Sequence, residues 1–228
     1  AKDYVAERIG LEHIIPTLGV WESADDVDFL SLPNKFVIKC NHNSGQGMYI
    51  CKDKSKMDEV AVRDGLREGL LEDYFWPGRD KQYRDIPRRI LAEQFMEDPE
   101  QPVLIDYKVL CFNGEPKLIE VHMNRFTKDY TQDFYDINWR KLNIWQPGDK
   151  NSDILMKKPI LFDKMLQYSK MLSSNCAHLR VDWYIINNQL YFGEMTFFDA
   201  GGFLPFYPKK WNKILGSWIT LPEPTNCK

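Results

Sequence analysis

The sequence predicts an α+β protein whose sheets are antiparallel. Short apolar runs are joined by tight turn residues at Asn113-Gly114 and Asn187-Asn188, and helical patterns stand apart from them at 58–75 and 160–175. Asn and Gly tolerate the positive φ that short hairpin turns need, so each pair is expected to join two antiparallel strands. No strand–helix–strand unit typical of a parallel sheet is evident.

Turn residues and apolar periodicity divide the chain into successive elements. Residues 2–10 read as a helix ending at Gly10, a C-cap signal. Apolar runs bounded by turn residues then predict the strands and helices that follow: strands 35–39 and 48–51, helix 58–75, strands 89–96, 104–112 and 116–122, helix 160–175, and strands within 180–197. Segment 123–150 mixes aromatic and charged residues without a clear period, which indicates a long functional loop or cover. The turn-rich segment 97–102 predicts a boundary between an N-terminal lobe, 1–98, and a C-terminal lobe, 99–228.

Composition narrows the class of protein. The chain has 228 residues, 43% of them hydrophobic, and a net charge of −3, so no electrostatic case for nucleic acid exists. Its five cysteines are scattered, which argues against a disulfide framework. We therefore expect a reducing compartment, the cytoplasm. No apolar run is long enough for a membrane span, and no signal peptide is evident. Because the sequence starts within a helical pattern, we expect that part of an N-terminal segment is missing.

The stretch from Arg180 to Gly202 holds the strongest candidate site. A three-residue loop at 187–189 would place Asp182 opposite Glu194, whereas a two-residue loop would shift the register and separate the two acids. With the longer loop one face is charged and the other apolar: Arg180, Asp182, Glu194 and Thr196 on the first, and Val181, Trp183, Ile185, Tyr191, Met195 and Phe197 on the second. Facing carboxylates need a shared proton or a cation, and Mg²⁺ prefers such oxygen ligands. The alternative is an acid pair neutralised by Arg180 on a solvated face.

The N-terminal half offers a candidate phosphate-binding hairpin. Strand 35–39 is followed by the loop Cys40-Asn-His-Asn-Ser-Gly-Gln-Gly47, whose glycines let main-chain N–H groups approach a phosphate. Lys39 could reach the same phosphate as a point charge. A flexible turn is the alternative interpretation. Glu93 lies within an apolar strand, as a carboxylate either at a hinge between lobes or on an outward face.

The Asn113-Gly114 hairpin brings further polar residues together. Asp106 and Lys108 share one face of its first strand, and Glu120 and His122 are expected on the facing strand. His122 by itself is more typical of a packed or surface histidine than of a ligand.

In their order and spacing these segments resemble the ATP-grasp superfamily, and most closely its TupA-like branch, associated with teichuronopeptide and surface-polysaccharide biosynthesis. The resemblance covers nearly all of 2–215 and is carried by five segments: KFVIKCNHNSGQG, RRILAEQF, IDYKVLCFNGEPK, NRF…FYDINW and HLRVDWYIINNQLYFGEMTF. It implies an ATP-grasp fold, in which two α+β lobes clasp ATP between antiparallel sheets.

The resemblance also implies roles for particular residues. Lys39, the loop residues Ser44, Gly45 and Gly47, and the hinge residues Glu93, Gln94 and Phe95 would bind ATP. Asp182 and Glu194 would hold Mg²⁺ or Mn²⁺. Thr196 stands where the family usually has Asn, which makes it a weaker metal ligand and leaves the number of metals open. Arg180, Lys108 and Arg125 are the cations available for catalysis: Arg180 for transition-state charge, and Arg125 for a substrate carboxylate or the γ-phosphate.

The implied chemistry is carboxylate activation. ATP phosphorylates a carboxylate, and an amine then displaces phosphate to form an amide. A hexuronic acid of a bacterial surface polysaccharide, with an amino acid or amino sugar, is the substrate pair suggested. A kinase on the same fold, a polysaccharide-associated glycosyltransferase and an inactive nucleotide-binding module are the alternatives.

Overall fold

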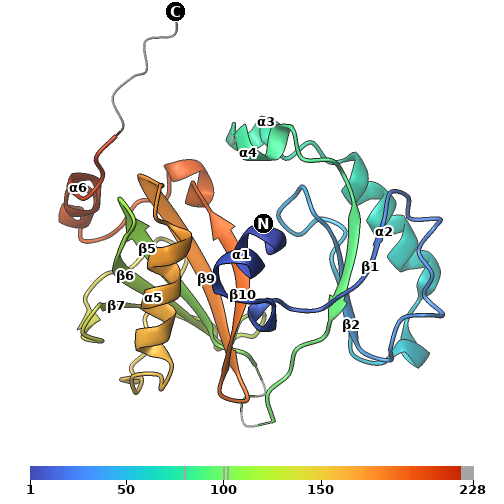
Figure 1. The fold of residues 1–228 in the computed structure, drawn as a ribbon, viewed down its shortest axis with the longest axis horizontal. Coiled ribbons are helices and arrows are strands. Elements are labelled where there is room, and N and C mark those ends of the chain that lie inside the picture. Colours follow the sequence, from blue (N-terminus) through green and yellow to red (C-terminus); the bar gives the residue numbers. More distant parts are fainter. Residues whose placement is uncertain (80, 100, 102, 222–228) are drawn as a thin grey trace, which may run out of the picture. The chain divides into compact units, whose positions relative to one another are not determined.

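The computed structural model describes residues 1–79, 81–99, 101 and 103–221, and the chain forms two compact units (Figure 1). The N-terminal unit is Ile15–Met96, and the C-terminal unit joins Ala1–Ile14 to the chain from Glu97 onward. Residues 1–14, which were expected in the N-terminal lobe, thus group with the C-terminal unit. Helix α1 (Lys2–Ile9) belongs with the C-terminal unit because Val5 and Ile9 are buried in that unit's core.

The N-terminal unit is a four-stranded antiparallel sheet with one face covered by a helix. Its strand order is β1-β4-β2-β3, with bounds Thr17–Trp21, Ile90–Gln94, Phe36–Cys40 and Tyr49–Cys51. Helix α2 (Glu59–Leu71) begins at Asp58, whose carboxylate accepts a hydrogen bond from the Ala61 N–H at 3.0 Å. Leu66 of α2 is buried with Phe36 and Ile38 of the sheet. The 3₁₀ turn η2 (Lys54–Lys56) precedes α2, and the short helices α3 (Phe75–Gly78) and α4 (Lys81–Arg84) lie between α2 and β4.

The C-terminal unit is built on a six-stranded antiparallel sheet. Its strand order is β10-β9-β5-β6-β7-β8, with bounds Gln189–Thr196, His178–Ile186, Asp106–Phe112, Glu115–Met123, Thr131–Asp136 and Lys141–Leu142. Helix α5 (Phe162–Leu172) lies against one face, where Met165 and Phe162 pack with Val109 and Val181. The 3₁₀ turns η1 (Leu11–His13) and η3 (Asp199–Gly202) follow α1 and β10. Segment 123–150, expected to be a loop or cover, instead supplies the two strands β7 and β8.

The opposite face of this sheet changes character along the strands. At one end Leu110, Phe112 and Phe134 are apolar and pack with Leu215 of helix α6 (Lys210–Ser217). At the other end the same strands present charged side chains. Because successive side chains of a strand alternate between faces, β5 contributes Val109 to the core under α5 and Lys108 to the charged end.

The hairpin of β9 and β10 corrects the expected loop length. Asn187 and Asn188 form a two-residue turn with φ of 49° and 58°, and Gln189 pairs with Ile186, so the three-residue loop was wrong. A β-bulge between Phe192 and Met195 then resets the register, leaving Gly193 and Glu194 opposite Asp182.

The bulge explains which side chains enter the core. Before it Phe192 pairs with Trp183 and is buried beside it, whereas Tyr191, which was expected on the apolar face, is only half-buried. After it Met195 packs on the core and Thr196 pairs with Arg180. Phe197, also expected on the apolar face, is 38% exposed.

Within the described parts of the chain, no helix is both long enough and apolar enough to cross a membrane.

The loop after β2 rests directly on the backbone of α2. A Cβ added to Gly47, whose φ is 74°, would lie 2.7 Å from the Gly65 carbonyl oxygen. A Cβ added to Gly69 would lie 2.7 Å from the Gln46 carbonyl oxygen and 3.1 Å from the Gly47 Cα. Only residues without a side chain allow this close approach.

Asn43 completes this seat with two hydrogen bonds. Its Nδ2 donates to the Gly69 and Gln46 carbonyl oxygens, each at 3.0 Å. Ser44 and Gly45 at the tip remain exposed. The loop is therefore fixed at its base while its tip is open to solvent.

We predict that Gly69→Ala loosens this loop, since the new Cβ must displace backbone atoms, a kind of overpacking that costs ~1–3 kcal/mol. Amide hydrogen exchange at Gly45 and Met48, whose N–H groups bond within the loop, should become about tenfold faster or more. Gly65→Ala on the same helix is the matched control, because its added Cβ meets no described heavy atom within 4 Å. Equal exchange in the two variants would contradict the seat.

Candidate functional site

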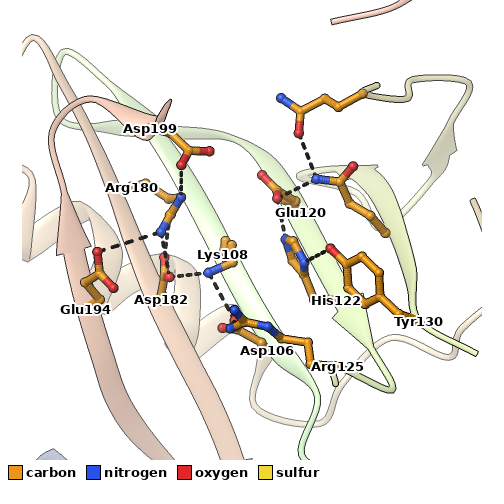
Figure 2. Close-up of polar contacts among 12 residues, drawn as sticks. Asp106, Lys108, Glu120, His122, Arg125, Tyr130, Arg180, Asp182, Glu194 and Asp199 are labelled. Carbon is orange, nitrogen blue, oxygen red and sulfur yellow. Dashed lines mark hydrogen bonds and ion pairs between the residues drawn. The ribbon is translucent and has the colours of Figure 1, made fainter. Parts of the chain in front are cut away.

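One end of the C-terminal sheet carries a layer of buried charged side chains. Strand register aligns them in rows: Asp106 pairs with His122, and Lys108 pairs with both Glu120 and Asp182. With Arg180 these residues form what we call the charged face, and all six are at most 8% exposed (Figure 2). Charged groups are rarely buried without partners, so their contacts decide what this layer can do.

Lys108 lies at the centre of the charged face. Its ammonium donates to Asp182 Oδ2 through a short contact and to Asp106 Oδ2 at 3.0 Å (Figure 2). Burial favours the neutral amine, but the two carboxylates outweigh it, so the pKa of Lys108 is raised. Lys108 therefore stays charged and holds two carboxylates of neighbouring strands together.

Arg180 neutralises the acids at the β9–β10 edge. Its Nε and Nη2 donate to the two oxygens of Asp182 at 2.7 and 3.0 Å, and its Nη1 forms an ion pair with Asp199 Oδ1 at 2.7 Å. The Glu194 carboxylate lies 3.9 Å from Nη2. Burial lowers the pKa of Arg180, but the nearby Asp182 and Asp199 raise it by more. The pKa of Arg180 is therefore raised above its ordinary value. Arg180 therefore lies within ion-pair distance of both acids of the expected pair, the buried Asp182 and the more exposed Glu194.

The three expected metal ligands are only partly brought together. Thr196 Oγ1 donates to Glu194 Oε1 at 2.7 Å, and the Glu194 side chain is 55% exposed. Both oxygens of Asp182, in contrast, are bonded to Arg180 and Lys108. Among the described residues no group of three or more His, Cys, Asp or Glu side chains is placed to hold a metal ion. All three side chains offer the oxygen donors that a hard cation prefers. Glu194 and Thr196 could use them, whereas the Asp182 oxygens are already bonded to Arg180 and Lys108.

Arg125 joins the charged face from the segment after β6. Its Nη1 donates to Asp106 Oδ2 at 2.8 Å, the oxygen that Lys108 also contacts. The other oxygen, Asp106 Oδ1, is buried and has no hydrogen-bond partner among the described residues. Because a buried carboxylate oxygen without a donor is costly, this atom marks a place where a ligand can bind.

A second polar network continues from Glu120. Its carboxylate oxygen Oε1 lies in short contact with His122 Nε2 and accepts from Gln132 Nε2 at 2.7 Å. His122 Nδ1 lies 2.6 Å from the Tyr130 hydroxyl oxygen, and Gln132 Nε2 also donates to Gln146 at 2.8 Å. His122 is therefore neither an isolated core histidine nor a surface one. The period-2 pattern of strand 116–122 predicted that Glu120 and His122 share a face. No sequence pattern in 124–150 indicated their partners Tyr130, Gln132 and Gln146.

Two of the expected nucleotide-binding residues, Lys39 and Glu93, lie on neighbouring strands of the N-terminal sheet. Lys39 Nζ contacts Glu93 Oε2 at 2.7 Å, and the two residues share the sheet face opposite α2 with Val37 and Leu91. Val37 and Leu91 thus place apolar side chains beside this cation and carboxylate. An aromatic ring can bind where apolar side chains adjoin a few polar groups.

The hinge residues Gln94 and Phe95 follow directly on Glu93. The Gln94 N–H donates to the Pro16 carbonyl oxygen at 3.0 Å, so it is not available to bind a base edge in this structure. Lys35 Nζ lies 5.9 Å from the centroid of the Phe95 ring.

The antiparallel sheets of the two units define an ATP-grasp fold. The chain resembles the D-alanine–D-alanine ligase of Bacillus anthracis complexed with ATP, with 15% identity and a TM-score of 0.50 over 86% of this chain and 50% of that one. The ligase of Helicobacter pylori matches with 14% identity and a TM-score of 0.53 over 98% and 57% of the respective chains. At such identities the likeness is one of fold, and this chain spans little more than half the length of these ligases.

The family assignment is more specific than the fold. Residues 1–220 match the TupA-like ATPgrasp family, and the chain belongs to it. This confirms the family resemblance that the sequence motifs gave. A comparison with curated proteins finds no match.

Glu120 predicts an acid-sensitive step in folding stability. Burial raises the pKa of Glu120, but the hydrogen bond and charge of His122, with Arg180 and Lys108, lower it from 4.5 to about 2. A lowered folded-state pKa contributes stability above pH 4.5 that is lost as the pH falls towards 2, here ~3 kcal/mol. We predict that the free energy of unfolding of Glu120→Gln, measured in urea between pH 6 and 2, falls less steeply with decreasing pH than that of the wild type.

Glu7→Gln, at an exposed carboxylate of α1, is the control and should keep the wild-type pH dependence. An unchanged slope in Glu120→Gln would contradict the ionised state of the buried carboxylate.

Proposed function

We propose that this protein is an ATP-dependent carboxylate–amine ligase that forms an amide through an acyl phosphate. The observation that carries the proposal is the fixed set of cations on the charged face, where Lys108, Arg125 and Arg180 are each held by buried carboxylates. Transfer of a phosphoryl group spreads negative charge over its oxygens, and preorganised cations stabilise that charge. Membership of the ATP-grasp class supports ATP as the phosphoryl donor.

The N-terminal unit holds the residues that bind the nucleotide in this proposal. In the N-terminal unit Lys39 contacts phosphate, and the Ser44–Gly47 loop offers main-chain N–H groups to the same phosphates. Glu93 holds the ribose, and the main chain at Gln94–Phe95 lies along the adenine. The bond from the Gln94 N–H to Pro16 leaves the Gln94 carbonyl as the group of that residue to contact adenine.

A divalent cation, Mg²⁺ or Mn²⁺, accompanies ATP in this proposal. Glu194 and Thr196 would hold it, since a half-exposed carboxylate and a hydroxyl are oxygen donors of the right kind. Asp182 would join them only by giving up one of its two cationic partners. The metal would supply charge neutralisation for the phosphates, while Arg180 and Lys108 orient and stabilise the group being transferred.

The reaction conserves every group. A substrate carboxylate oxygen attacks the γ-phosphorus of ATP, the bond to the β-phosphate oxygen breaks, and ADP leaves. An amine nitrogen then attacks the acyl carbon, phosphate leaves, and the amine loses a proton. We propose a uronic acid of a bacterial surface polysaccharide as the carboxylate and a cytoplasmic location, where ATP is supplied.

The test is to trap the acyl phosphate with hydroxylamine. The wild-type protein is incubated with MgATP and a panel of uronic acids that includes glucuronate and galacturonate, and hydroxamate and ADP are measured. Hydroxamate should form only with both ATP and a carboxylate. Arg180→Gln should reduce its rate by about 10²–10³, the cost of removing one transition-state donor.

The exposed Arg140→Gln is the matched control and should retain the wild-type rate. A stable phosphoester without hydroxamate would contradict the ligase and support a kinase on the same fold. ATP consumption that does not depend on Arg180 would contradict the assignment of the site.

A further inference from the structure

Tyr130 is linked through His122 to Glu120 by hydrogen bonds, and the last two belong to the charged face. The His122 ring is buried, with Nδ1 2.6 Å from the Tyr130 hydroxyl oxygen and Nε2 in short contact with Glu120 (Figure 2). The Tyr130 and His122 rings are stacked, with centroids 5.7 Å apart and an interplanar angle of 27°. None of these residues has a role in the phosphoryl transfer described above.

Glu120 fixes the orientation of the imidazole. The Glu120 carboxylate oxygen Oε1 lies in short contact with His122 Nε2. It is also positioned by Gln132, which is held in turn by Gln146. An ionised carboxylate at Nε2 favours a proton on that nitrogen, which leaves the Nδ1 lone pair to accept from Tyr130.

The Tyr130 hydroxyl is the end of the series that can meet a substrate. In the tautomer that Glu120 favours, Tyr130 donates its proton to His122 Nδ1, so the lone pairs of its oxygen remain to accept a hydrogen bond. Burial raises the pKa of Tyr130, and the negative charges of Asp149 and Glu120 raise it further, while Arg125 opposes them. Tyr130 is therefore a neutral phenol at neutral pH. It can take a proton from a substrate only while its own proton moves to His122.

The surroundings suit a cationic substrate group. The negative charges of Asp106, Glu120 and Asp149 interact electrostatically with Tyr130 or His122. Asp106 Oδ1 is a buried acceptor without a hydrogen-bond donor among the described residues. The cations on this side, Lys108 and Arg125, are already paired with Asp106. An ammonium group supplies the donors that such acceptors lack.

We propose that Tyr130 binds the attacking amine and relays its proton to His122. The inference rests on the proposed ligase function. An ammonium N–H gives its proton to the Tyr130 oxygen as the Tyr130 proton moves to His122 Nδ1, which frees the nitrogen lone pair. The neutral amine then attacks the acyl carbon, the bond to phosphate breaks, and the second N–H proton leaves with the departing phosphate. The resulting imidazolium is stabilised by Glu120 and later releases its proton to phosphate or solvent. Tyr130 is then a catalytic residue, and His122 and Glu120 are positioning residues that act through it.

The test compares two nucleophiles on the same acyl phosphate. Hydroxylamine is neutral at pH 7 and needs no base, whereas a primary amine, here glycine or glucosamine, arrives as an ammonium ion. With the carboxylate that yields hydroxamate, Tyr130→Phe should keep the hydroxamate rate and lose about 10²-fold in amide formation. Raising the pH should recover the amide rate, because the free amine no longer depends on the relay.

Tyr191→Phe on β10 is the matched control and should change neither reaction. Equal loss of hydroxamate and amide in Tyr130→Phe, or no loss of either, would overturn the relay while leaving the ligase intact. Absence of hydroxamate in the wild type would instead count against the proposed ligase.

A measurement without substrate tests the relay independently of any chosen amine. Nitrogen-15 NMR of His122 at neutral pH should find one ring proton, on Nε2, and a Nδ1 signal that shifts in Tyr130→Phe because the hydrogen bond is lost. A doubly protonated His122 at neutral pH could accept no proton, and that result would overturn the proposal.

Discussion

The buried contact of Lys108 with Asp106 and Asp182 is the interaction on which the charged face depends. It joins β5 to β9, and it gives two carboxylates a cationic partner in a layer that water scarcely reaches. Removing one member of such a set leaves a buried charge without its partner, at a typical cost of 3–5 kcal/mol. Arg180 on Asp182 and Arg125 on Asp106 extend the same alternation of charge outward. The positions of all three cations are therefore fixed before any substrate arrives.

The same strands that carry this charge also build the core. Alternation along β5 and β9 directs Val109 and Val181 towards α5, while Lys108 and Asp182 point the other way. Hydrophobic packing on one face thus holds the register that aligns the charges on the other. A slip of one residue would bury the charges under α5, so the core enforces the geometry of the site.

Much of this arrangement could be predicted from the sequence, and the remainder could not for physical reasons. Asn113-Gly114 and the period-2 patterns around it placed Asp106, Lys108, Glu120 and His122 together, since turn chemistry and alternation are local properties. The bulge at Gly193 and Glu194 was missed because a bulge adds one residue without any change in composition. Strand β7 was missed because four consecutive residues of it are buried on both faces, which removes the alternation that reveals a strand. The neutralisation of Asp182 by Lys108 depends on pairing across 74 positions of sequence, which no local pattern reports.

The most direct test of the central claim is a calorimetric titration of ATP, with and without Mg²⁺, into the wild type, Lys39→Ala and the exposed control Lys56→Ala. We predict one Mg²⁺-dependent site in the wild type and in Lys56→Ala. In Lys39→Ala we predict affinity weakened by about tenfold or more, the ~1.4 kcal/mol or greater expected from the loss of a charged contact to phosphate. The absence of ATP binding by the folded wild type, or equal affinity in Lys39→Ala, would contradict the nucleotide site described for this chain.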